Sequence, residues 1–282
     1  MTAALSMRRR LTNSVMLVSS GVCTILAVSV LFFILGYLFI KGGASVNLDF
    51  FTKLPVPTGE TGGGMANAIL GSAKVLMLAT CIGVPIGFIA GIYLSEYAGA
   101  VFASVVRFTT DLLNGVPSIV IGIVVYTLVV LKTGVGPLAG GIALGIMMIP
   151  IALRSTEEFL RAVPNSLREA SMALGANKWK TIVAVVVPAA IRGIVSGMML
   201  NLARVAGETA PLLLTAGLSM YYNHGWRDPV ATLPVMIYTD ASSPQEDLHQ
   251  QAWAAGFVLL SLVLLVNIVA RTIVSRGSHK AR

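Results

Sequence analysis

Long apolar runs alternate with short polar segments along most of the chain. A helix of about 20 apolar residues crosses the ~30 Å hydrocarbon core of a bilayer, so each long run is a candidate membrane span. The third and fifth runs are longer than one span, and we expect them to be kinked or to extend beyond the membrane. The pattern predicts an all-α, polytopic membrane protein with six transmembrane helices, at Val15–Ile40, Asn67–Leu94, Val101–Leu131, Val135–Leu153, Thr181–Leu218 and Trp253–Val274.

Composition agrees with this class, because 56% of the 282 residues are hydrophobic and only 11% are charged. Both cysteines, Cys23 and Cys81, lie inside apolar runs. We therefore predict that they are small buried side chains without a disulfide. Three arginines, Arg8 to Arg10, precede the first run, which is too long for a signal peptide and favours an uncleaved anchor.

The net charge of +8 is distributed unevenly along the chain. Lysine and arginine gather in the N-terminal tail, in residues 154–192 and in the C-terminal tail, whereas the intervening loops carry more acidic than basic residues. Because basic loops stay in the cytoplasm, we predict that both the N- and C-termini are cytoplasmic. The basic balance thus reports topology and does not indicate nucleic-acid binding.

Two longer segments are predicted outside the membrane. Residues Gly42–Met65 include the glycine-rich run Gly59–Gly64, and we expect a short interfacial helix around Leu48–Leu54. Ser219–Gln251 carries aromatic side chains that are either interface anchors or a docking surface for an external partner: Tyr221, Tyr222, Trp226 and Tyr238.

A polar, capped segment interrupts the apolar pattern after Pro164. Ser166 and Glu169 have the spacing of a capping box, which predicts a helix over residues 167–174. Gly175 is placed to end that helix in a left-handed conformation, and Asn177 is placed to cap the next one. The result is a rigid, L-shaped pair of helices on the cytoplasmic side. An ordinary structured loop along the membrane surface is the alternative.

The same segment resembles the EAA loop of the permease subunits of type I ABC importers. Its residues Glu169-Ala170-Ser171, Gly175 and Val185-Val186-Val187-Pro188 match that spacing, with Ser for the second Ala and Val for Ile and Leu. The resemblance implies that loop 154–180 is a coupling helix that docks on a separate ATPase. The implied coupling residues are Glu169, Ala170, Ser171, Leu174, Gly175 and Ala176.

The chain contains no Gly-x-x-x-x-Gly-Lys-Ser/Thr phosphate loop. We therefore expect a transporter subunit and not an enzyme, with no cofactor in this chain and with ATP and Mg²⁺ on partner subunits. An ion channel or an ion-coupled carrier is a competing class, which the EAA pattern disfavours. An intramembrane enzyme or metal site is also disfavoured, because the histidines lie outside the spans: His224, His249 and His279.

Five of the ionisable residues within the predicted spans are candidates for a substrate path, because charges there are costly. Arg204 and Glu208 are four residues apart, as are Arg107 and Asp111, so each pair is expected on one helical face; Lys74 stands alone. The alternative is that each pair neutralises itself and only ties helices together.

Gly207 and Pro211 flank Glu208 and predict a helix kink. Irregular backbone at membrane depth occurs where it lines a cavity or is covered by protein, so residues 204–211 are predicted to line a path. A guanidinium fixed there favours an anion whose oxygens match its forked donors.

Two stretches, "ARVAGETAPLLLTAG" and "DLLNGVPSIVIG", resemble the permeases of the bacterial phosphate uptake system, and the likeness extends from about Gly71 to Arg276. The resemblance implies inorganic phosphate as substrate, a PstC-like sister permease, two copies of a PstB-like ATPase and an external, PstS-like phosphate-binding protein. It also implies the bacterial inner membrane. A permease for another oxyanion, molybdate or sulfate, is the alternative. We divide the chain into an N-terminal part, residues 1–66, and a permease domain, residues 67–282.

Overall fold

The computed structural model describes residues 2–57 and 62–277, without the side chains of residues 2–8 and 274–277. Gly59 and His279, which belong to the predicted outer loop and the histidine set, lie outside the described residues. Every regular element in the described ranges is helical, so the predicted all-α class is confirmed.

Five helical segments are long and apolar enough to cross a membrane. They are α1 (Thr2–Ser45), α3 (Ala66–Glu96), α7 (Pro137–Arg161), α13 (Glu246–Gly277), and the continuous run of α9 (Lys178–Thr181), the π-helical turn η2 (Ile182–Val186) and α10 (Val187–Ala206). A sixth candidate is a bent pair, in which α4 (Ala100–Gly115) meets α5 (Ser118–Val125), η1 (Tyr126–Val130) and α6 (Leu131–Thr133) at 96°. All six predicted spans are therefore helical.

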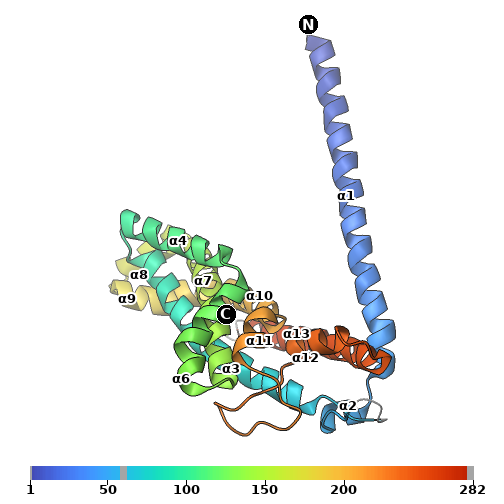
Figure 1. The fold of residues 1–282 in the computed structure, drawn as a ribbon. Coiled ribbons are helices and arrows are strands. Elements are labelled where there is room, and N and C mark those ends of the chain that lie inside the picture. Colours follow the sequence, from blue (N-terminus) through green and yellow to red (C-terminus); the bar gives the residue numbers. More distant parts are fainter. Residues whose placement is uncertain (1, 58–61, 278–282) are drawn as a thin grey trace.

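Helices α3 and α7 pack closely and form the centre of the bundle (Figure 1). Three glycines of α3, at one-turn intervals, face α7: Gly83, Gly87 and Gly91. A Cβ atom at these positions would lie 2.5 to 2.6 Å from the Cβ atoms of Met148, Ala152 and Thr156. Since any side chain there would separate the two helices, the glycines set how closely α3 and α7 approach.

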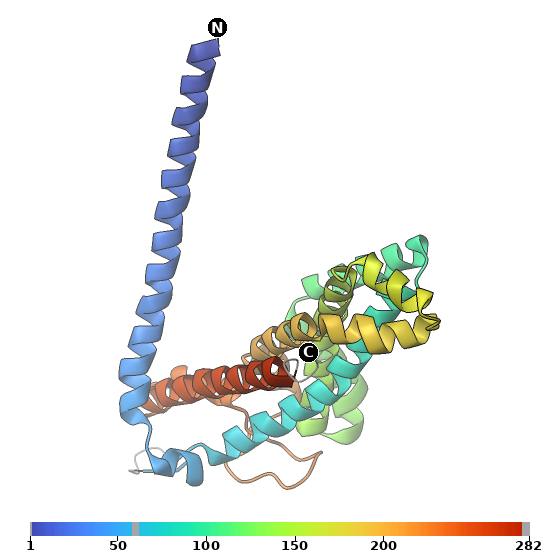
Figure 2. The ribbon, with the colours of Figure 1, turned by 180° about the vertical axis from the view of Figure 1, so that it is seen from behind.

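Helix α1 leaves the bundle and contacts it near its C-terminal end, against the start of α13 (Figures 1 and 2). The rings of Tyr37 and Trp253 are 5.0 Å apart, and Gly42 packs on the backbone of Trp253. The predicted burial of Cys23 and Cys81 is wrong, because both side chains are free and exposed on the chain. A membrane helix is apolar on its outer face too, so apolar neighbours in the sequence do not imply burial.

Two of the predicted spans are broken. Pro117 separates α4 from α5, where it cannot donate a backbone hydrogen bond. In the fifth span α10 ends at Ala206, and α11 (Ala210–Thr215) begins with Pro211 in its first turn. The predicted irregularity of the third and fifth spans is confirmed, and both breaks lie in the same part of the bundle.

The connecting segments gather at opposite ends of the bundle (Figures 1 and 2). One end holds α2 (Leu48–Thr52), which agrees with the short helix expected there, and α12 (Leu233–Ala241). The other end holds α8 (Asn165–Ala173), α9 and α4. This separation matches the division into two sides that the loop charges predict.

Candidate functional site

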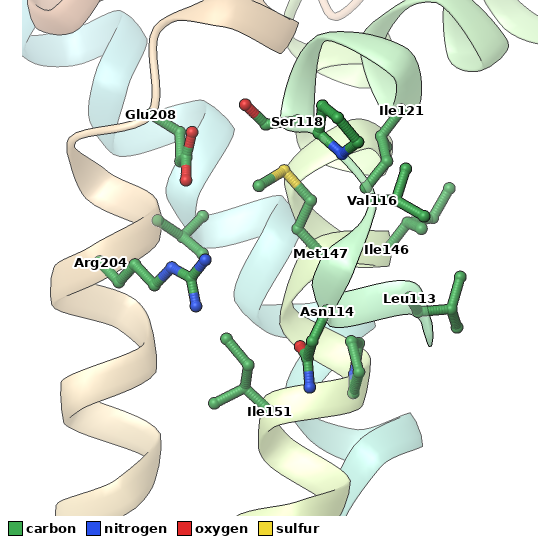
Figure 3. Close-up of a pocket in the computed structure, with 13 residues that line it drawn as sticks. Leu113, Asn114, Val116, Ser118, Ile121, Ile146, Met147, Ile151, Arg204 and Glu208 are labelled. Atoms are coloured by element: carbon green, nitrogen blue, oxygen red, sulfur yellow. The ribbon is translucent and has the colours of Figure 1, made fainter. Parts of the chain in front are cut away.

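A cavity of about 200 Å³ lies between the two helix breaks. Its wall is mostly apolar, with Ile121, Met147 and Ile151 among the lining side chains (Figure 3). Its polar side chains come from the two breaks: Asn114, Ser118, Arg204 and Glu208.

Arg204 and Glu208 both line this cavity, but not as one face of a helix. Arg204 lies in the last turn of α10, whereas Glu208 follows the end of that helix at Ala206. Their predicted placement on one helical face is wrong, because the break at Gly207 turns the chain between them. Among the described residues neither side chain has a hydrogen bond or an ion pair, so the two do not neutralise each other.

The opposite wall contains two polar residues that the sequence did not single out. Asn114 is at the end of α4 and Ser118 is the first residue of α5, on either side of Pro117. Figure 3 shows the Ser118 hydroxyl directed toward the side of the cavity that holds Glu208. The proline within an apolar run was the signal that could have identified this second break.

Arg107 and Asp111 do not pair with each other, so the alternative in which this pair neutralises itself is wrong. Arg107 Nη2 lies 2.7 Å from Oε1 of Glu157, whose side chain is only 4% exposed. Asp111 Oδ1 lies 2.6 Å from Arg154 Nη2. Both bonds connect α4 to α7 and leave the two residues outside the cavity lining. Their role in a substrate path stays a prediction.

Lys74 has a different environment from the other predicted path residues. Its ammonium donates to the backbone oxygen of Asn223 at 2.5 Å and to the Asn223 side-chain oxygen at 3.3 Å. Asn223 in turn donates to the backbone oxygens of Asp228 and Pro229. Lys74 thus fixes the loop after α11 onto α3, and its predicted place on a substrate path is not tested by this geometry.

A larger groove of about 440 Å³ lies between α3, α10 and α13, but its lining is almost entirely apolar. The polar groups on its wall already have partners, because Thr80 donates to Leu76, Asn267 donates to Val263 and the Ser72 hydroxyl accepts the Leu233 N–H. A charged ligand would lose its hydration there without compensation. The smaller, polar cavity is therefore the better candidate site.

The predicted elbow between α8 and α9 is confirmed at its glycine. Gly175 has a φ of +86°. Its N–H donates to the Met172 carbonyl, and the Ala176 N–H donates to the Ser171 carbonyl. This is the Schellman pattern of a helix C-terminus. Asn177 caps α9 as predicted, since its side-chain oxygen accepts the Lys180 N–H at 2.8 Å.

The predicted capping box at the start of α8 is wrong. The helix begins at Asn165, directly after Pro164, and no side chain caps it. Arg168 binds the end of the preceding helix, because its guanidinium donates to the backbone oxygens of Leu160 and Val163. Ser166 and Glu169 are both exposed.

Arg168 also joins α8 to the end of α3. Its guanidinium lies 2.8 Å from Glu96 Oε1, and both side chains are largely buried, at 16% and 7% exposure. Lys178 donates to the Glu96 carbonyl and lies 4.5 Å above the ring of Tyr97. The α8–α9 elbow is thus bound to α3 from both of its arms.

The free face of α8 exposes apolar side chains. No residue of the helix is buried, and Leu174 at its end is 90% exposed. Met172 and Trp179 are exposed as well. Exposed apolar groups gathered on a rigid element are typical of a docking surface.

Residues 83–278 match the family of binding-protein-dependent transport system inner membrane components. A phosphate transport system permease protein PstA from Yersinia pestis is 42% identical over 273 residues, covering 96% of this chain and 92% of the relative. PstA of Haemophilus influenzae is 41% identical over 93% of this chain and 94% of its own, and PstA of Mycobacterium leprae is 38% identical over 94% and 89%. The chain belongs to the PstA group of these permeases.

Solved permeases share the fold of this PstA-family chain. A bacterial ABC transporter for alginate superposes with a TM-score of 0.60, covering 95% of this chain and 99% of that structure at 14% identity. The inward-facing methionine ABC transporter MetNI gives a TM-score of 0.57 over 74% of this chain and 97% of its own, at 18% identity. This PstA-family permease is therefore a multi-pass membrane protein with the fold of ABC importer permeases.

Proposed function

We propose that this chain is a permease subunit of an ATP-driven importer of inorganic phosphate. The observation that supports this best is Arg204, whose guanidinium faces a cavity between two helix breaks and has no partner among the described residues. A guanidinium offers several N–H donors in one plane and matches the oxygens of phosphate. The PstA relatives are phosphate permeases by name, which gives the substrate.

In this proposal the chain forms the translocation path together with a PstC-like sister permease, in the bacterial inner membrane with both termini in the cytoplasm. Residues 1–66 form the N-terminal part, and residues 67–282 form the permease domain. A PstS-like protein delivers phosphate from outside. The path is lined by Arg204 and Glu208, while Lys74, Arg107 and Asp111 fix the helices around it.

Energy comes from two PstB-like subunits, which carry the ATP and Mg²⁺. The exposed face of α8 docks on one of them, through Glu169, Ala170, Ser171, Leu174, Gly175 and Ala176. The Schellman turn at Gly175 keeps α8 and α9 at a fixed angle, so that movement of the ATPase is passed on and not absorbed.

Uptake of radiolabelled phosphate at low micromolar concentration tests this function. Cells that lack their own copy are complemented with the wild type, with Arg204→Gln or with Arg192→Gln. Arg192 is an exposed arginine of α10 that does not line the cavity, so it is the matched control. We expect uptake with the wild type and with Arg192→Gln, and loss of uptake with Arg204→Gln at equal membrane levels.

Competing anions test the identity of the substrate, whereas Arg204→Gln tests the path. Excess sulfate or molybdate should leave phosphate uptake unchanged, and competition by either would favour the other oxyanion as substrate. Normal uptake by Arg204→Gln would remove Arg204 from the path.

A further inference from the structure

The polar groups of the cavity between the two breaks come from four separate positions. Arg204 and Glu208 flank the end of α10, and Asn114 and Ser118 flank the bend between α4 and α5. The remaining lining is dominated by apolar side chains. A cavity of about 200 Å³ is more than ten times the roughly 10–15 Å³ that one water needs, so it accommodates a small anion with some of its hydration.

The hydrogen-bonding capacity of these four side chains is unused within the described residues. Several other polar side chains of the bundle do have partners. Arg107 binds Glu157, Arg168 binds Glu96 and two carbonyls, and Asn201 donates to the Met148 carbonyl. Ser118 and Glu208 are partly buried, and partly buried polar groups are normally satisfied, so their unused capacity beside Arg204 and Asn114 indicates a polar ligand.

The charge of Glu208 restricts the class of anion that this cavity can bind. A carboxylate beside an anion repels it, unless the anion carries a proton that the carboxylate can accept. Phosphate keeps at least one proton at neutral pH, whereas sulfate keeps none. Arg204 and the Asn114 amide supply N–H donors and Ser118 supplies an O–H donor, while ionised Glu208 can only accept.

We propose that this cavity is a selective site for a protonated tetrahedral oxyanion. In it Arg204, Asn114 and Ser118 donate to the oxygens of hydrogen phosphate, and the Glu208 carboxylate accepts a hydrogen bond from the phosphate hydroxyl, which keeps its proton. The permease then selects its substrate within the membrane. It rejects sulfate because the Glu208 carboxylate and sulfate are both unprotonated anions and repel each other. This inference deepens the proposed function and rests on it.

Direct binding tests the site without the external binding protein, which would impose a selectivity of its own. The permease complex with its ATPase subunits is purified in detergent, and inorganic phosphate binding is followed by saturation-transfer ³¹P NMR. Arsenate, which also carries a proton, and sulfate, which does not, are added as competitors. We expect arsenate to displace phosphate, and sulfate to need at least a tenfold higher concentration, as one lost charged hydrogen bond predicts.

Variants assign this selectivity to residues. Glu208→Gln replaces the acceptor with a neutral amide that also donates, so sulfate should then compete about as well as arsenate. Asn114→Ala and Ser118→Ala should each weaken phosphate binding roughly three- to tenfold, in line with one hydrogen bond. Asn267→Ala is the matched control, because Asn267 faces the apolar groove and bonds within α13. Gel filtration confirms that each variant complex is assembled.

The outcomes are distinct. Equal competition by sulfate and arsenate in the wild type, or continued exclusion of sulfate by Glu208→Gln, would overturn the role of Glu208. Wild-type binding in Asn114→Ala and Ser118→Ala would remove the second wall from the site. Absence of phosphate binding by a complex that still supports phosphate uptake would refute the site and leave the proposed function intact. Loss of the proposed function itself would appear as phosphate uptake that does not depend on the chain.

Discussion

Replacing Arg168 with alanine should uncouple ATP hydrolysis from transport. The Arg168 guanidinium connects α8 to two helices at once, since it bonds Glu96 at the end of α3, the Leu160 carbonyl in the last turn of α7 and the Val163 carbonyl just beyond it. No residue of α8 is buried, so this side chain is its main attachment to the bundle, together with the contact of Ser171 with Thr181. A movement of α8 would reach α3 and α7 through it.

The magnitude follows from the burial of the pair. Arg168→Ala leaves the Glu96 carboxylate largely buried without its cation, and breaking such a pair costs about 3–5 kcal/mol. The α8–α9 elbow can avoid this cost by moving away from α3 as one unit, because the Gly175 turn fixes the angle between its arms and Lys178 then holds the second arm to Glu96 by a single hydrogen bond. We therefore expect a detached α8 to predominate, which corresponds to at least a tenfold fall in transport for each ATP hydrolysed.

Proteoliposomes that contain the full importer allow both quantities to be measured. Phosphate uptake and ATP hydrolysis are recorded for the wild type, Arg168→Ala, Arg168→Lys and the control Arg192→Ala. Lysine keeps the charge but lacks the forked donors that reach several acceptors, so its ratio of uptake to hydrolysis should be intermediate. An unchanged ratio in Arg168→Ala would refute the reasoning, and a parallel loss of both activities would point instead to lost docking of the ATPase.

Three further predictions test other parts of the structure. Gly87→Ala should lower the stability of the detergent-purified chain by about 1–3 kcal/mol, because its Cβ would meet the Ala152 Cβ at 2.5 Å. Gly36→Ala, with open space around it, should be neutral or stabilising by up to ~1 kcal/mol in the same thermal melts. Burial raises the pKa of Asp240, which is 4% exposed, from 3.8 to about 6. The free energy of unfolding therefore falls by about 3 kcal/mol as pH rises through this range, because the folded state holds the proton more tightly. Thermal melts at pH values below and above the range should show this fall in the wild type and not in Asp240→Asn. Gly175→Val should abolish phosphate uptake at normal membrane levels, because a β-branched residue is strained at a φ of +86°, whereas Gly175→Asn should retain part of it.

The sequence predicted the spans well because each depends on a local apolar run. It also predicted the break at Pro211, because a proline acts on its own segment of backbone, whereas for the third span it predicted only a kink or an extension and did not place the break at Pro117. The side-chain pairs were not predictable in the same way. Arg107 has Asp111 at the correct spacing on its own helix, yet it binds Glu157, fifty positions away in the chain. That choice depends on how α4 lies on α7, which no local pattern contains.

The capping box failed for a related reason. Ser166 and Glu169 have the required spacing, but Pro164 already fixes the start of the helix at Asn165, two residues earlier than predicted. Arg168, between them, then binds the carbonyls that end the preceding helix. A spacing motif is thus weakened wherever a neighbouring side chain has partners on another helix.

The presence or absence of a bonding partner distinguishes structural from path-lining ionisable residues better than sequence spacing does. Lys74, Arg107 and Asp111 each bind a group on another element, which holds the bundle together. Arg204 and Glu208 have no partner in the described parts of the chain, although charges in a membrane are costly. Because both lie at a helix break, their neighbours cannot be supplied by the next helical turn. A ligand that passes through the cavity is the partner which would justify keeping both charges there.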